Sequence, residues 1–186
     1  GDTCEAFKTS SGKLVMLLSD GMGSGKKASI DSNVVANVVQ RIMKAGFPVD
    51  MAVRVVNSAL LLKDDDERLT TADIAVIDLY GGKCEFIKAG AAPTYVRRGG
   101  TVYRLESHSL PAGILNTINV EKFQLSLVES DIIVMISDGV LANGSDEMIV
   151  KQIERFKGKD PLDLCSEILH NAAEKGKGVI SDDMSV

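Results

Sequence analysis

Apolar and polar residues follow three successive patterns along the chain, and each pattern predicts a different kind of element. Residues 3–8 and 14–19 have the pattern of two strands joined by a turn at 10–13. The second of these strands is apolar with little alternation, which is typical of a strand buried on both faces. Apolar residues then recur at helical spacing, which predicts helices over 26–45 and 49–63.

Each of these helices carries one apolar stripe that we expect to face a hydrophobic core. Gly46 and Pro48 separate the helices, because neither residue continues a helix well. The stripe of the first helix consists of Val34, Val35, Val38, Val39, Ile42 and Met43. The stripe of the second helix consists of Met51, Val55, Ala59 and Leu62.

The rest of the chain returns to strand patterns and ends in helical ones. Gly81-Gly82 and Gly99-Gly100 are typical of hairpin turns between consecutive strands. Helices over 145–157 and 161–174 precede a last strand that starts near Asp183. The strands of this region are predicted over 71–79, 83–89, 94–98, 101–106, 119–128 and 131–137.

This order of elements predicts the fold class. Consecutive strands joined by tight turns favour antiparallel sheets, and the helices come in two antiparallel pairs. The economical packing is an α/β (α+β) fold, a four-layer α-β-β-α sandwich with a helix pair on each outer face. The length of 186 residues fits a single domain, 1–186. The chain begins at Gly1 without a methionine and stops at Val186 inside an apparent strand, so we expect a segment of a longer protein.

Composition and charge argue against several classes of function. A net charge of −5 argues against nucleic acid as the main partner and fits carboxylates gathered for a metal ion. Cys4, Cys84 and Cys165 are odd in number and far apart, which favours a reducing compartment and three small core residues. No apolar run approaches the roughly 20 residues that span a bilayer, so we expect no membrane contact from this segment.

Three acidic motifs carry the candidate chemistry: Ser19-Asp20-Gly21, Ser137-Asp138-Gly139 and Ser181-Asp182-Asp183. In the first two, an apolar strand ends in an aspartate, and the following glycine lets backbone or a ligand approach closely. Oxygen ligands at strand ends suit hard cations such as Mg²⁺ or Mn²⁺, which would relieve repulsion between converging carboxylates. Asp-Gly is also a common turn pair, so a plain turn stays open as the alternative.

The glycine-rich segment 21–26 raises nucleotide binding as a second alternative, because it follows a strand and precedes a helix. It does not match the P-loop, since Asp20 stands where the first glycine belongs and Lys27 where Ser or Thr belongs. A dinucleotide site would need a second strand with an acidic end about 20 residues further on, where a helix is predicted instead. These mismatches favour the metal site.

The acidic motifs, in this order and spacing, resemble those of the metal-dependent 2C-type protein serine/threonine phosphatases. The resemblance runs along essentially the whole chain. Within this family, the chain is similar to the stage II sporulation protein E type, because it also contains Gly1-Asp2-Thr3-Cys4 and Leu110-Pro111-Ala112-Gly113-Ile114. The motifs that carry it are Asp20-Gly21-Met22-Gly23, Ser137-Asp138-Gly139 and Asp182-Asp183-Met184-Ser185.

The resemblance implies roles for individual residues. Asp20 would bridge two Mn²⁺ or Mg²⁺ ions, and the Gly21 carbonyl would ligate one of them. Asp138 and Asp182 would complete the coordination of the other ion, and Asp2 would hold metal-bound water. The implied reaction is hydrolysis of phosphoserine or phosphothreonine by a water that the two ions activate, without a side-chain nucleophile.

The resemblance also implies a setting and shows two departures. The implied substrate is a phosphorylated protein of the anti-sigma-factor-antagonist kind, in sporulation or sigma-factor control. The implied location is a cytoplasmic domain whose parent protein is anchored at a membrane or septum. Asp183 stands where many relatives have asparagine, which makes it the alternative ligand to Asp182. Larger relatives bind phosphate with an arginine near the start of the domain, and residues 1–20 contain no counterpart of it. Lys26 or Lys27, which follow the glycine-rich segment, are the nearest replacements.

A non-catalytic alternative follows from the same resemblance: a catalytically weak or inactive phosphatase-like binding or regulatory module. The presence of all three core aspartates argues against it. The helices within 26–63 lead directly out of Asp20-Gly21, so we expect them to be a regulatory element whose shift changes metal occupancy. The same helices are a candidate homodimer contact.

Overall fold

The computed structural model describes residues 1–23, 26–62, 69–115, 117–118, 120–176 and 182–186. Contacts within the chain group into two compact units. The first unit contains residues 1–91 and 107–127, and the second contains 92–106 and 128–186. Four expected features lie wholly or partly outside the described residues: residues 24–25 of the glycine-rich segment, residue 63 at the end of the second predicted helix, residue 119 at the start of a predicted strand, and Ser181 of the third acidic motif.

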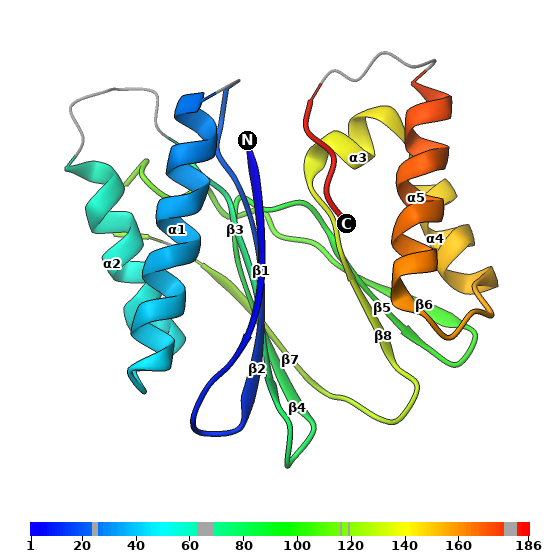
Figure 1. Cartoon of the computed structure of the whole chain (residues 1–186), viewed down its shortest axis with the longest axis horizontal. Coiled ribbons are helices and arrows are strands. Elements are labelled where there is room, and N and C mark those ends of the chain that lie inside the picture. The colour runs from blue at the N-terminus through cyan, green and yellow to red at the C-terminus, as the bar shows by residue number, and fades with distance from the viewer. Residues whose placement is uncertain (24–25, 63–68, 116, 119, 177–181) are drawn as a thin grey trace. The chain divides into compact units, whose positions relative to one another are not determined.

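The first unit is a five-stranded antiparallel sheet with a helix pair on one face (Figure 1). The strand order is β1-β2-β3-β4-β7, so strands joined by hairpins lie next to one another. The bounds confirm the predicted hairpin, helix pair and following strands. The elements are β1 (Asp2–Lys8), β2 (Lys13–Asp20), α1 (Lys26–Lys44), α2 (Val49–Leu61), β3 (Ala72–Asp78), β4 (Lys83–Ala89) and β7 (Glu121–Ser126).

Helices and sheet of this unit share one hydrophobic core. Val35, Val39 and Met43 of α1 are buried in it, as the predicted stripe of this helix requires. Alternate residues of β2, such as Val15 and Leu17, face the same core, which is the period-two pattern of a strand. Full burial of a side chain of this size contributes about 1.5–3 kcal/mol.

The predicted buried stripe of α2 is wrong. Met51, Val55 and Leu62 are 44%, 39% and 84% exposed. The helix is apolar around much of its circumference, so more than one stripe fits helical spacing, and only packing on the sheet selects the buried one. The buried residues of α2 are Val49, Ala52, Val53, Val56, Asn57 and Leu60.

The second unit is a three-stranded antiparallel sheet of order β6-β5-β8 with its own helices. Tyr95 of the sheet is buried with Ile149, Ile153 and Ile168 of the helices in a separate core. Two antiparallel sheets, each packed with its own helices, are therefore confirmed. The elements are β5 (Thr94–Arg98), β6 (Thr101–Leu105), β8 (Ile132–Met135), α3 (Asp138–Asn143), α4 (Asp146–Arg155) and α5 (Pro161–Lys175).

Two features of this unit differ from the sequence analysis. Helix α3, which starts at Asp138, was not predicted, because a helix of 6 residues is too short to show a period. The expected last strand from Asp183 is an irregular segment, 182–186, that pairs through one backbone bond of 3.0 Å from the Ser137 N–H to the Ser185 carbonyl. Met184 packs against the hydrophobic core and helps to hold this segment.

A buried ion pair joins β3 and β4 of the first unit. Asp73 and Lys88 are cross-strand partners, with 2.5 Å between Lys88 Nζ and Asp73 Oδ2 and at most 1% of either side chain exposed. Burial lowers the pKa of Lys88, while the neighbouring Asp73 carboxylate opposes that shift.

The three cysteines have different environments. Cys84 is buried, as expected, and Cys165 is half-buried. The expectation for Cys4 is wrong, because it is exposed on β1, which is an edge strand of its sheet. Among the described helices, none has both the length and the apolar character needed to cross a bilayer.

Candidate metal centre

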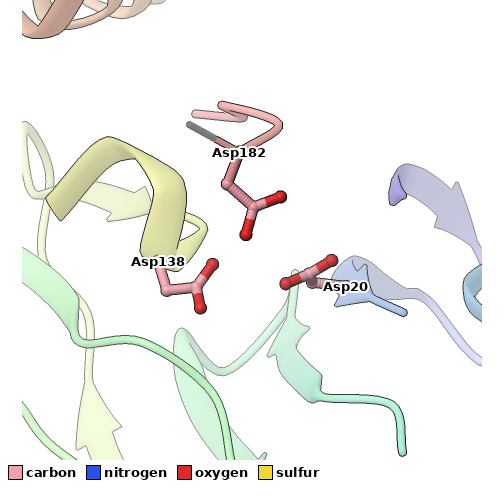
Figure 2. A group of neighbouring side chains, drawn as sticks. All are labelled: Asp20, Asp138 and Asp182. Atoms are coloured by element: carbon pink, nitrogen blue, oxygen red, sulfur yellow. The ribbon is translucent and has the colours of Figure 1, made fainter. Parts of the chain in front are cut away.

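Asp20 stands at the C-terminal end of β2 (Figure 2), and Asp2 lies directly opposite it on β1. Asp20 is 9% exposed. Both carboxylate oxygens of Asp2 are buried and have no hydrogen-bond partner in the described part of the chain. Like charges directly opposite on neighbouring strands repel, and a buried unpaired carboxylate is costly. A cation at this point, or water held by one, would relieve both costs.

The main chain around Asp20 is fixed by Thr71, in the segment before β3. The Thr71 N–H donates to the Asp20 carbonyl at 2.8 Å, and the Asp20 N–H donates to Thr71 Oγ1 at 2.9 Å. The Ser19 hydroxyl donates to the Thr71 carbonyl at 2.7 Å. Three hydrogen bonds therefore hold the strand end that carries the aspartate.

Gly21 continues the strand by one residue and pairs with Thr70 in an isolated bridge. The hydrogen bonds of this bridge are made by the residues that flank Gly21 and Thr70. One of them runs from the Met22 N–H to the Leu69 carbonyl at 2.8 Å. In this type of pair the Gly21 carbonyl points away from Thr70, toward Gly1, where an added Cβ would lie 2.9 Å from the Gly21 carbonyl oxygen. A Cβ at Gly21 would lie 2.1 Å from the Ala28 carbonyl oxygen in α1, so the close backbone approach predicted for this glycine is confirmed.

Asp138 and Asp182 lie together in the second unit. Asp138 opens α3 directly after β8, and Asp182 belongs to the segment 182–186. Their carboxylates point toward one another (Figure 2), with an oxygen of each within 4.8 Å of the other. Both side chains are exposed, so an ion can reach them from solvent.

Ser137 ties the Asp182 segment to the start of α3. The Ser137 hydroxyl accepts a bond from the Ser185 N–H at 2.9 Å and donates to the Asp183 carbonyl at 3.3 Å. The motif Ser137-Asp138-Gly139 contains this serine but does not by itself indicate the role. The repeated serine before an aspartate is the signal that could have found it, because Ser19 ties the first motif to its neighbour in the same way.

Gly139 lets this segment approach α3. A Cβ at Gly139 would lie 2.1 Å from the Asp183 carbonyl oxygen and 3.3 Å from Asp182 Cβ. The close approach predicted for the second Asp-Gly pair is therefore confirmed as well. Asp183 contributes main-chain groups here: its carbonyl accepts from Ser137, and its N–H donates to Asp182 Oδ1 at 2.8 Å.

The donor set of these residues suits a hard divalent cation. The carboxylates of Asp2, Asp20, Asp138 and Asp182 and the Gly21 carbonyl offer oxygen atoms only, as Mg²⁺ and Mn²⁺ prefer. Lys26 and Lys27, the candidate phosphate contacts, are exposed in the first turn of α1.

The fold matches solved phosphatase structures. The PP2C phosphatase domain of SpoIIE from Bacillus subtilis, solved with a fragment of its regulatory domain, has a TM-score of 0.89 and 29% identity and covers 98% of this chain and 56% of that chain. RsbX in complex with magnesium has a TM-score of 0.76 and 17% identity, covering 98% and 83%. The chain therefore has the mixed α/β fold of the PP2C-type serine/threonine phosphatases, a class in which divalent metal is bound.

Sequence comparison defines the family more narrowly. The family model described as Stage II sporulation protein E (SpoIIE) matches residues 10–186. Stage II sporulation protein E of Bacillus subtilis (strain 168) is 30% identical over 191 aligned residues, covering 100% of this chain and 23% of the relative. The chain belongs to the SpoIIE family and is homologous to bacterial serine/threonine phosphatases. It spans about a quarter of the length of that relative.

Proposed function

We propose that the chain hydrolyses phosphoserine or phosphothreonine in a protein, using two Mn²⁺ or Mg²⁺ ions held by Asp20, Asp138 and Asp182. The observation that carries the proposal is the Asp2 carboxylate, which is buried without a partner directly opposite Asp20. Such a group is costly unless a cation or a cation-held water satisfies it. Membership of the SpoIIE family supports the same conclusion.

Each residue has a role that its position supports. The strand end fixed by Thr71 would present the Asp20 carboxylate and the Gly21 carbonyl as ligands. Asp138 and Asp182 would supply the remaining carboxylates, and Asp2 would orient water beside the ions. The bound ions would supply Lewis acidity toward the phosphate and lower the pKa of a coordinated water. No side-chain nucleophile is part of the proposal, so no covalent phosphoryl intermediate is expected.

The proposed substrate is a phosphorylated anti-sigma-factor antagonist, in sporulation or sigma-factor control. Membership of the SpoIIE family supports this assignment. The proposed setting is a cytoplasmic domain of a protein anchored at a membrane or septum.

The exposed Met51, Val55 and Leu62 of α2 support the proposal that the helices within 26–63 form a homodimer contact. Sedimentation of a Leu62→Glu variant would test this proposal.

The test is hydrolysis of p-nitrophenyl phosphate and of a phosphoserine protein against Mn²⁺ concentration. Asp138→Asn removes one proposed ligand charge and keeps the side-chain shape. Asp163→Asn is the matched control, because Asp163 is exposed in the first turn of α5, away from the Asp138–Asp182 pair in sequence. We expect metal-dependent turnover that falls by at least about 100-fold in Asp138→Asn and is unchanged in Asp163→Asn.

Three outcomes would contradict the proposal. Turnover that is independent of added metal would remove the metal ions from the reaction. Turnover that is equal in Asp138→Asn and the original chain would remove Asp138 from the site. Binding of Mn²⁺ and of the phosphoprotein without any hydrolysis would instead establish the regulatory-module alternative.

A further inference from the structure

Asn57 is a buried polar residue on the otherwise largely apolar packing face of α2. It is 2% exposed, and its neighbours on that face are Val53, Val56 and Leu60. Its side-chain amide makes two hydrogen bonds to one loop. Nδ2 donates to the Leu115 carbonyl at 2.9 Å, and Oδ1 accepts from the Gly113 N–H at 3.0 Å. A carbonyl can only accept and an N–H can only donate, so both partners fix the same orientation of the amide.

The loop that Asn57 holds is itself paired with the segment before β3. The Ala112 N–H donates to the Thr70 carbonyl at 3.0 Å, and the Thr70 N–H donates to the Ala112 carbonyl at 3.2 Å. Ala112 is fully buried in the core of the first unit. On its other side, Thr70 pairs with Gly21. Ala112 therefore lies beside the segment 69–71, and that segment lies beside the segment 20–22 on its other side. These pairings continue past the C-terminal end of β2 and the N-terminal end of β3.

We propose that Asn57 is a positioning residue for the metal centre, acting through this loop on the Asp20 main chain and the Gly21 carbonyl. The inference rests on the proposed function, because it assumes that these two groups bind metal. An apolar side chain at position 57 would pack on the core but would leave the Gly113 N–H and the Leu115 carbonyl without their partner. The loop would then lose its link to α2, and only the two main-chain bonds between Thr70 and Ala112 would hold the segment 69–71 on the side away from Gly21.

The expected signature is a change in metal affinity without a change in chemistry. Asn57 touches none of the proposed ligands, so its loss leaves every ligand atom present and only widens the range of positions that Asp20 and Gly21 sample. Partners that orient metal ligands typically account for roughly 10–100-fold in metal affinity. We expect Asn57→Ala to raise the Mn²⁺ dissociation constant about tenfold, while kcat at saturating Mn²⁺ stays within about twofold of the original chain.

The experiment measures Mn²⁺ binding directly by isothermal titration calorimetry on the whole chain, with turnover as a second readout. Val53→Ala is the matched control, because Val53 is 3% exposed one turn earlier on the same face and makes no side-chain hydrogen bond. It loses core packing as Asn57→Ala does but leaves the loop bonds intact. Asn57→Asp is a second variant that keeps an acceptor for the Gly113 N–H but turns a buried carboxylate oxygen toward the Leu115 carbonyl, so a dissociation constant at least as high as that of Asn57→Ala is expected.

The outcomes separate the inference from the proposed function. Weaker Mn²⁺ binding in both Asn57 variants, with wild-type binding in Val53→Ala, supports the inference. Equal effects in Val53→Ala and Asn57→Ala, or an unchanged dissociation constant in Asn57→Asp, would overturn it while leaving the proposed function standing. Absence of Mn²⁺ binding by the original chain would overturn the proposed function and the inference together.

Discussion

Gly139→Ala tests whether the close approach of two main-chain segments is what forms the Asp138–Asp182 pair. The new Cβ would lie 2.1 Å from the Asp183 carbonyl oxygen, whereas ordinary contact begins at 3.4 Å. The segment 182–186 would therefore have to retreat by about 1.3 Å, the difference between these two distances. The new Cβ is attached directly to the helix main chain, and its two nearest contacts are main-chain atoms of Asp183, so no side chain can rotate away to absorb the clash.

Two consequences of this retreat can be given magnitudes. It would weaken the three hydrogen bonds between Ser137 and the Ser185–Asp183 stretch, each contributing about 0.5–1.5 kcal/mol. Alanine is about 1 kcal/mol better than glycine inside a helix, so we expect a net destabilisation of only about 1–3 kcal/mol. Displacement of the Asp182 carboxylate by about 1 Å would lower turnover roughly 100-fold.

The assay combines Mn²⁺ calorimetry, phosphatase turnover and urea denaturation. Gly100→Ala is the matched control, because a Cβ at Gly100 meets nothing within 4 Å and its backbone does not need glycine. We expect the control to bind Mn²⁺ and turn over as the original chain does. A folded Gly139→Ala variant with unchanged Mn²⁺ affinity would refute the claim that this approach positions Asp182.

Three further outcomes follow from the same structure. Lys88→Met removes the cation beside the buried Asp73 carboxylate and should destabilise the chain by about 3–5 kcal/mol in urea denaturation. Lys88→Met with Asp73→Leu should recover most of that loss, and an additive double variant would contradict the pairing. The Arg98 guanidinium and the Val128 N–H lower the pKa of Asp131 below its usual value of 3.8. This carboxylate therefore stabilises the fold above pH 3.8, and the contribution is lost as pH falls through the lower pKa of the folded state. Asp131→Asn should flatten the acid limb of a stability–pH curve, and an unchanged limb would show that Asp131 does not contribute to the acid dependence. Burial raises the pKa of the Cys84 thiol to about 12, while Cys4 is exposed, so iodoacetamide at pH 8 should label Cys4 and spare Cys84 in the native chain, as peptide mass spectrometry would show.

The sequence by itself determined the candidate ligands and the kinds and order of the elements, except for α3 and the segment 182–186. These depend on local information: the period of apolar residues, the glycine pairs at hairpin turns, and aspartates placed at the ends of two apolar strands. The close backbone approach at Gly21 and Gly139 could also be predicted, because a residue without Cβ directly after a strand end is a local signal for it.

Only the tertiary structure decided which surfaces and side chains meet. The buried face of α2 depends on the sheet beneath it, and a helix apolar on several sides cannot specify that face alone. The position of Asp2 opposite Asp20 depends on the register of β1 against β2, which a one-residue slip would change completely. The bonds of Ser137 to Ser185 and of Asn57 to the loop at 113–115 join residues far apart in the chain. Contacts of this kind are set by packing between distant segments. The serine before each aspartate is a local signal, but it does not specify the residue that the serine will contact.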